Sequence, residues 1–207
     1  MKENIIRARN KTNSKQQFLN AVGRILQNKG HEGLKVNDIA QVAGLDKKLI
    51  YKYFGGLDGL LDEYLHTQDF WSNVNTDLEP DKVKDHGKAI GLQLLQNQFD
   101  YVFQNKEFQK VLLWGLAEER ESLKKLTDDQ EENGEALFSN ITDPHFGDKA
   151  TDFRAVMAIL ISGIYYLNLY SEVNGSVFCG LDLKEEKSRA TIKNALKFLV
   201  DATYDKL

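Results

Sequence analysis

The sequence predicts an all-α protein of about nine helices, with a three-helix N-terminal domain ahead of a larger helical domain. Apolar residues recur with the 3.6-residue period of amphipathic helices, and we find no segment with the alternation expected of strands. Only two of the 207 residues are proline and 28% are charged, a composition that favours helices. The apolar fraction of 42% is sufficient for an ordinary soluble core.

The chain begins with a basic segment and a first amphipathic helix. Residues 1–13 carry four basic side chains with little periodicity, so we expect them to form a flexible basic arm. A helix should follow over residues 15–28, because Phe18, Val22 and Leu26 are spaced to share one buried face.

Two short helices separated by a glycine are the most informative feature. Residues 36–43 carry an apolar stripe at positions i, i+3, i+4 and i+7. Gly44 can end that helix, because glycine adopts the left-handed conformation without a Cβ penalty. Asp46 can cap the next helix, expected over residues 47–54, which turns basic side chains outward. The pattern predicts a helix-turn-helix whose second helix can enter a DNA major groove.

The remaining helices follow from the same periodicity. Gly55 and Gly56 break the chain, and segment 73–85, which contains Pro80, is expected to be a loop. Further helices are predicted over residues 58–71, 87–104, 106–121, 123–139, 149–173 and 184–204. The longest apolar run, residues 156–167, is too short to span a bilayer and predicts a buried helix.

Charge is distributed unevenly along the chain. Up to Phe54 there are eleven Lys and Arg against four Asp and Glu, a net charge of +7. The remainder holds sixteen against twenty-seven, a net charge of −11, and the two parts sum to the overall −4. A basic end on an acidic protein is typical of a chain that meets a polyanion at that end only.

Segment 14–66 resembles the DNA-binding domain of the tetracycline-repressor (TetR) family of transcription regulators. The similarity rests on the order of a leading amphipathic helix, Gly30, the IAQVAGL turn, the LIYKYF helix, a glycine break and an apolar helix from Asp58. It implies an all-α chain divided into a basic arm over 1–13, a helix-turn-helix DNA-binding domain over 14–57, and a ligand-binding and dimerisation domain over 58–207.

The candidate DNA contacts lie on the second helix of the motif or just before it. Phosphates provide most of the affinity for DNA, and base edges provide specificity. Lys47 and Lys48 stand at the end of the helix that meets bases, and the resemblance places Tyr51 and Tyr53 against the DNA backbone. The alternative is that these are solvated lysines and packing tyrosines. The full candidate set is Lys35, Lys47, Lys48, Leu49, Tyr51, Lys52 and Tyr53.

Three residues depart from the family pattern. Leu49 replaces a small or hydroxylated residue, which favours apolar contact with a thymine methyl group. Lys48 stands where glycine is frequent. Leu57 replaces a lysine that commonly contacts phosphate, which removes one expected contact. The glycines at 55, 56 and 59 either make this junction a pliable hinge or serve only the turn and the approach of the backbone to a phosphate.

The resemblance implies a ligand cavity and a dimer interface in the larger domain. Aromatic side chains with polar tips suit an apolar ligand that has a few hydrogen-bonding groups, so the candidate lining residues are Trp114, Tyr165 and Tyr166. A filled helical core is the alternative. Two apolar helix faces are candidates for the four-helix interface of a homodimer. They are formed by Val156, Leu160, Gly163 and Leu167, and by Ile192, Leu196 and Leu199.

Catalytic and metal-binding patterns are weak in this sequence. The four histidines are scattered, without the spacing of an HExxH or a similar motif, and Cys179 is the single cysteine. We find no glycine-rich phosphate loop. We therefore expect no enzyme activity, no catalytic residue, no cofactor and no metal, and we expect the protein to reside in the cytoplasm.

These observations predict a ligand-responsive transcription regulator, most often a repressor in this family, that binds a pseudo-palindromic operator as a dimer. Its expected partners are a double-stranded DNA operator, a small-molecule effector and a second copy of the chain, with no membrane. The alternative is a helical small-molecule-binding protein or enzyme whose N-terminal domain no longer binds DNA, which the departure at Leu57 favours.

Overall fold

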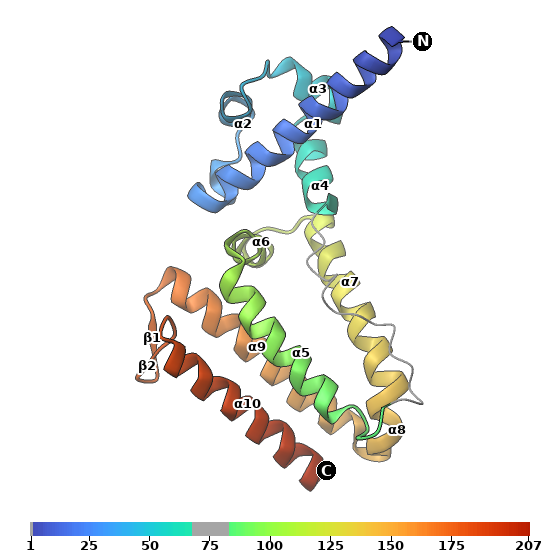
Figure 1. Ribbon diagram of the computed structural model, residues 1–207, viewed down its shortest axis with the longest axis vertical. Helices are drawn as coiled ribbons and strands as arrows, with labels where there is room; N and C mark the ends of the chain where they lie inside the picture. The colour runs from blue at the N-terminus through green and yellow to red at the C-terminus, as the bar shows by residue number, and fades with distance from the viewer. Residues whose placement is uncertain (1, 68–82) are drawn as a thin grey trace. The chain divides into compact units, whose positions relative to one another are not determined.

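The structure, a computed structural model, describes residues 2–67 and 83–207 (Figure 1). The first part contains α1 (Lys2–Lys29), η1 (His31–Gly33), α2 (Val36–Ala43), α3 (Lys48–Phe54) and α4 (Leu57–Thr67). The second contains α5 (Lys88–Gln104), α6 (Lys106–Ala117), α7 (Glu121–Leu137), the π-helical turn η3 (Phe138–Thr142), α8 (Asp143–Phe146), η4 (Gly147–Lys149), α9 (Ala150–Val173), β1 (Val177–Phe178), β2 (Leu181–Asp182) and α10 (Glu186–Lys206). The all-α prediction is confirmed, with one short hairpin of antiparallel strands that the sequence did not predict.

The chain forms two compact units. The head unit comprises Met1–Phe70 and Lys106–Asp128, and the body unit comprises Trp71–Asn105 and Asp129–Leu207. The head unit therefore extends beyond residue 57, where we placed the end of the DNA-binding domain, and it includes α4 and α6. The expected helix end over residues 68–71 and most of the expected loop lie outside the described residues.

The structure differs from the sequence-based expectation at the N-terminus. We expected a flexible arm over residues 1–13, but α1 begins at Lys2 and runs without a break to Lys29. Residues 2–13 contain neither glycine nor proline, so the helix that follows can extend through them at little cost.

The core of the head unit is built by α1, α2, α3, α4 and α6. Its fully buried side chains include Phe18 and Val22 of α1, Ile39 of α2 and Ile50 of α3. Polar bonds join the same elements. Lys15 of α1 contacts Glu63 of α4 at 2.6 Å, and the Tyr64 hydroxyl donates a short hydrogen bond to Glu107 of α6. The other helices of the head unit thus pack against α3 and hold it in place.

Gly59 brings two segments of the head unit close together. A Cβ atom at this position would lie 1.9 Å from the carbonyl oxygen of Phe54, the last residue of α3. No side chain fits at that distance, so glycine is required for α4 to pack against the end of α3. This packing role differs from both of our expectations for the glycine, which were a hinge and a turn that lets the backbone approach a phosphate.

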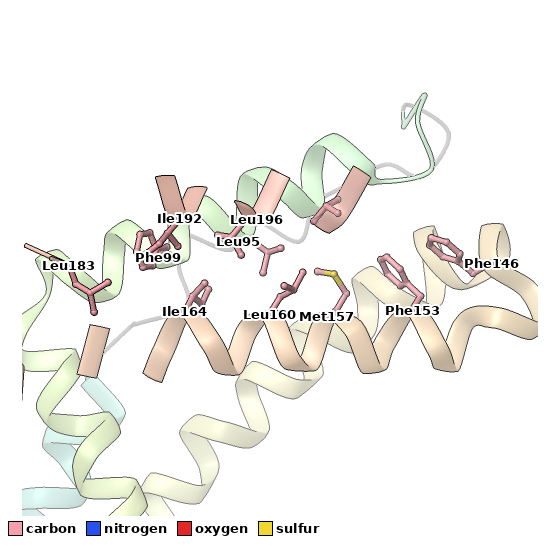
Figure 2. Close-up of a cluster of buried hydrophobic side chains, with 11 residues drawn as sticks. Leu95, Phe99, Phe146, Phe153, Met157, Leu160, Ile164, Leu183, Ile192 and Leu196 are labelled. Carbon is pink, nitrogen blue, oxygen red and sulfur yellow. The ribbon is translucent and has the colours of Figure 1, made fainter. Parts of the chain in front are cut away.

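The core of the body unit lies between α5, α9 and α10, as Figure 2 shows. Leu160 and Ile164 of α9 point toward Leu95 and Phe99 of α5, and Leu196 of α10 closes the cluster. One buried cation ties the same helices together. Its guanidinium, on Arg189 of α10, donates hydrogen bonds to the Asn168 side chain, to the carbonyl oxygen of Phe99 and to Asp100.

Candidate functional site

The turn between α2 and α3 has the geometry that its sequence predicts. Gly44 has φ of 67° and ψ of 29°, the left-handed conformation, and it ends α2. The Leu45 N–H donates to the carbonyl of Ala40 at 3.1 Å, which closes the turn. Asp46 then accepts a hydrogen bond from the Lys48 N–H at 2.8 Å. Because of these bonds, α3 begins three residues after Leu45 and its direction relative to α2 is fixed.

One face of α3 is basic and open to solvent. Ile50 is buried in the head core, while Lys47, Lys48 and Lys52 are exposed and Tyr51 keeps 58% of its surface exposed. Leu49 is half-buried, so only part of its side chain is accessible for an apolar contact. The helix thus turns ammonium groups and one phenol outward at the end where a helix in a major groove meets bases.

Basic side chains from neighbouring elements have different environments. Lys35, just before α2, is exposed, and the Lys47 ammonium donates to the Asn37 side chain at 3.1 Å. Tyr53 is half-buried, and the ammonium groups of Lys11 and Lys52 lie 5.8 and 5.9 Å from its ring centre. These two cations therefore stand beside a tyrosine whose candidate role is a backbone contact.

The start of α4 is acidic and is held by one arginine. Leu57 is the first residue of α4 and is half-buried. Its apolar side chain offers no charge to a phosphate. The Arg120 guanidinium contacts the carboxylates of Asp58 at 3.2 Å and Asp62 at 2.9 Å. Ser122 of α7 also donates to Asp62, at 2.8 Å. These bonds fasten α4 to α7 within the head unit.

The body unit contains a cavity of about 460 Å³, within the range of small-molecule sites. Its walls come from α5, α7, η3 and α9, and they are mostly apolar. Leu94, Leu137, Phe138, Met157 and Ile161 are among the apolar lining residues. The sequence left open whether this domain is hollow or filled, and the structure resolves that question in favour of a cavity.

Tyr165 contributes a polar group to the cavity wall. Its hydroxyl oxygen accepts hydrogen bonds from the side-chain amides of Gln98 at 3.2 Å and Gln130 at 2.8 Å. Burial raises the pKa of the Tyr165 hydroxyl well above its ordinary value, so the phenol stays protonated at neutral pH. Sequence reasoning identified Tyr165 but missed both glutamines, which carry no motif of their own.

The other two candidate lining residues are wrong. Trp114 belongs to the head unit, where it is buried, stacks on His31 and donates its indole N–H to Glu118 at 2.8 Å. Tyr166 is 56% exposed and packs against Tyr170 and Phe178 rather than lining the cavity. Adjacent helical positions differ by about 100°, so Tyr165 and Tyr166 cannot both face one cavity.

In the part of the lining that the structure describes, Arg154 is the one cation, and it contacts two carboxylates. Its terminal nitrogens contact Glu135 at 2.5 and 2.9 Å, and it also contacts Asp143 at 2.5 and 3.1 Å. The hydrogen bonds from Arg154 lower the pKa of Glu135 to about 2, and bonding to the same carboxylates raises the pKa of Arg154. Both groups therefore remain charged and paired at physiological pH.

Residues 18–64 match the sequence model of the family described as bacterial regulatory proteins, tetR family. The match begins within α1 and ends within α4, and it includes the whole helix-turn-helix. Over these residues the head is thus similar to the tetR family. The resemblance inferred from the sequence is thus confirmed, whereas a search of curated proteins found no match.

Solved structures extend the likeness to the body unit. The regulator FadR from Bacillus subtilis, solved with stearoyl-CoA, has a TM-score of 0.59 at 13% identity and covers 89% of this chain and 96% of its own. A regulator from Rhodococcus has a TM-score of 0.57 at 18% identity, covering 90% and 98%. The hemolysin II regulator HlyIIR has a TM-score of 0.53 at 13% identity, covering 93% and 97%. At such identities the likeness establishes the fold, and these relatives are transcriptional regulators rather than enzymes.

The faces of α9 and α10 differ from the stripes that we assigned to a dimer. Leu160, Ile192 and Leu196 are buried in the core of their own subunit, and Val156, Gly163 and Leu167 are half-buried. Of the expected set, Leu199 is exposed, at 43%. The most exposed apolar side chains on these helices are instead Ile159 at 72% and Phe198 at 70%. Both helices are apolar on more than one side, so periodicity alone selected the core-facing stripe.

Proposed function

We propose that this tetR-family protein is a ligand-responsive, DNA-binding transcription regulator that acts as a homodimer. The observation that carries the proposal is the exposed basic face of α3, positioned by the Gly44 turn and backed by the head core. Lys47 and Lys48 are then the candidates for base contacts, and Lys35, Tyr51, Lys52 and Tyr53 for contacts to the DNA backbone. The partly exposed Leu49 is a candidate contact for a thymine methyl group.

The proposed homodimer forms through α9 and α10, and it would allow the protein to bind a two-part operator. By length and composition, one helical stretch within Glu121–Val173 is apolar enough to cross a membrane, yet only 33% of it is buried in one subunit. Ile159, Phe198 and Leu199 leave apolar surface that a second copy would cover. A two-fold dimer then presents two α3 helices to the two halves of a pseudo-palindromic site.

Ligand binding in the body is the proposed control of DNA affinity. The cavity supports this, as does the fold likeness to FadR, which was solved with stearoyl-CoA. The proposed route is α7, because its residues from Gln130 to Leu137, except Glu132, line the cavity while Ser122, at the other end of the same helix, bonds to Asp62 of α4. A ligand that favours one position of α7 over another shifts the equilibrium between two states of operator affinity. If the bound ligand lowers the affinity for the operator, the protein acts as a repressor that the ligand releases from DNA. We place this regulator in the cytoplasm.

A second candidate is a helical small-molecule-binding protein whose head no longer binds DNA. The uncharged Leu57 and the acidic Asp58 at the start of α4 favour it, because neither attracts a phosphate. The exposed cations of α3 favour the first candidate, and the two can be separated by direct binding to DNA.

Operator selection followed by lysine substitution tests the role of α3. Fragments selected from random DNA by the full-length protein should share a pseudo-palindrome. Lys48→Ala should reduce the preference for the selected over a scrambled fragment by roughly 5- to 150-fold, because one base contact is worth about 1–3 kcal/mol. Lys52→Ala should weaken binding to both fragments alike, if it meets only phosphate.

The matched control is Lys125→Ala, which removes an exposed lysine of α7 in the same unit and should leave both affinities unchanged. Electrophoretic shifts on the two fragments give the ratio. Equal preference in the Lys48→Ala and unmodified proteins would show that Lys48 reads no base.

A further inference from the structure

The Tyr165 hydroxyl is one of several uncharged polar groups in the cavity lining, which also includes Asn133, Asn140 and Ser162. The Tyr165 oxygen accepts from two glutamine side chains, Gln98 and Gln130, which occupy its acceptor sites. Within the described part of the chain, no acceptor for the Tyr165 O–H is found. Because burial keeps this phenol protonated, it can donate one hydrogen bond to a bound molecule. The matching group on that molecule is an acceptor, such as a carbonyl oxygen.

The charges of the cavity disfavour an anion. Among the described residues that line the cavity, Arg154 is the only cation, and its guanidinium already contacts Glu135 and Asp143. Glu131 and Glu135 also line the cavity, so this described lining carries a formal net charge of −1. A carboxylate or phosphate placed here would lose its hydration, meet a net negative lining and find the one guanidinium already paired.

Most of the cavity lining favours a ligand that is largely apolar. The leucine, isoleucine, methionine and phenylalanine side chains named above supply most of the walls, and a volume of about 460 Å³ suits a molecule of drug size or smaller. Burial of apolar surface provides most of the affinity in such a site, while the few polar groups fix orientation.

We propose that this cavity binds an uncharged, largely apolar molecule that presents one hydrogen-bond acceptor to the Tyr165 hydroxyl. The inference rests on the proposed function only in treating the cavity as the effector site. Gln98 and Gln130 position the tyrosine, and the pairing of Arg154 with Glu135 and Asp143 selects against anionic amphiphiles of the same length.

Three probes with ten-carbon chains test this selectivity on the full-length protein. They are 2-decanone, decanoate and decyltrimethylammonium, titrated by calorimetry and checked by the rise in Tm that each causes. We expect 2-decanone to bind at least tenfold more tightly than either charged probe. Tyr165→Phe should weaken 2-decanone by about two- to tenfold, the range of one neutral hydrogen bond. Tyr166→Phe, which changes an exposed tyrosine outside the cavity, should leave its affinity unchanged.

A second substitution should increase the affinity for the anion. Glu135→Gln removes one negative charge and leaves Arg154 with a single carboxylate partner, so decanoate should bind several-fold more tightly while 2-decanone is unaffected. Glu132→Gln is the matched control, because Glu132 is exposed on the same helix but does not line the cavity.

The outcomes separate this inference from the proposed function. Tighter binding of decanoate or of the ammonium probe than of 2-decanone would overturn the inference, as would the absence of both heat and a Tm rise with all three probes. Equal loss of 2-decanone affinity in Tyr165→Phe and Tyr166→Phe would also overturn it. Failure of the unmodified protein to bind DNA would refute the proposed regulator, yet the order of probe affinities would remain measurable.

Discussion

Phe198→Asp is expected to convert the proposed dimer into a folded monomer. Phe198 is 70% exposed on α10, so an aspartate there adds no strain within its own subunit. In a dimer the same position is covered, and an unpaired buried charge costs several kcal/mol. Light scattering should change from twice the 23.6 kDa chain mass to one chain mass, with unchanged helical circular dichroism. Operator affinity should fall by about 10²–10⁴, because two linked heads bind more tightly than one.

Two comparison variants define this result. Leu116→Asp alters an apolar side chain of α6 that is 81% exposed in the head unit, and it should leave the dimer intact. Leu196→Asp places the charge at a residue that is 5% exposed in the body core, and it should unfold the subunit rather than dissociate the dimer. A folded monomer in the unmodified protein would contradict the proposed assembly and leave a two-part operator unexplained.

Gly59→Ala should destabilise the head unit and weaken operator binding without any ligand. The added Cβ would lie 1.9 Å from the Phe54 carbonyl oxygen, and a backbone atom cannot rotate away as a flexible side chain can. The free energy of unfolding should fall by at least the ~1–3 kcal/mol usual for overpacking. Thermal unfolding of the full chain, followed by circular dichroism, measures the change.

Gly115→Ala is the matched control in the same unit. Gly115 lies in α6, and a Cβ atom there would meet nothing within 4 Å, so alanine should be neutral or stabilise the helix by up to about 1 kcal/mol. If Gly59→Ala behaved like Gly115→Ala and altered only the response to a ligand, the junction would be a hinge and the packing explanation would be wrong.

The helix-turn-helix was predictable because its signals are local. Gly44 ends α2 and Asp46 starts α3 through bonds to residues no more than five positions away. The prediction of a flexible N-terminal arm was wrong because it rested on the absence of apolar periodicity in residues 1–13. A segment without apolar periodicity is not thereby flexible, and a helix that is already packed further along can extend through it.

The cavity and the exposed faces were less predictable because they depend on contacts between distant residues. The role of Gln98 and Gln130 could not be predicted, because it depends on α5 and α7 placing both side-chain amides against Tyr165. Phe198 was missed because α10 carries apolar residues on two sides, and only packing against α5 and α9 shows which side is free.

The central claim is that the head binds DNA through its exposed cations, and the salt dependence of binding tests it most directly. Each neutralised phosphate should contribute a slope of about −0.9 to the logarithm of the binding constant against the logarithm of salt concentration. For about 6–10 phosphate contacts, affinity should fall by roughly 10³–10⁵ between 50 and 200 mM salt. Such a fall, measured on a selected operator fragment, is the predicted result. A binding constant that stays unchanged over that range, or no binding at low salt, would contradict the account.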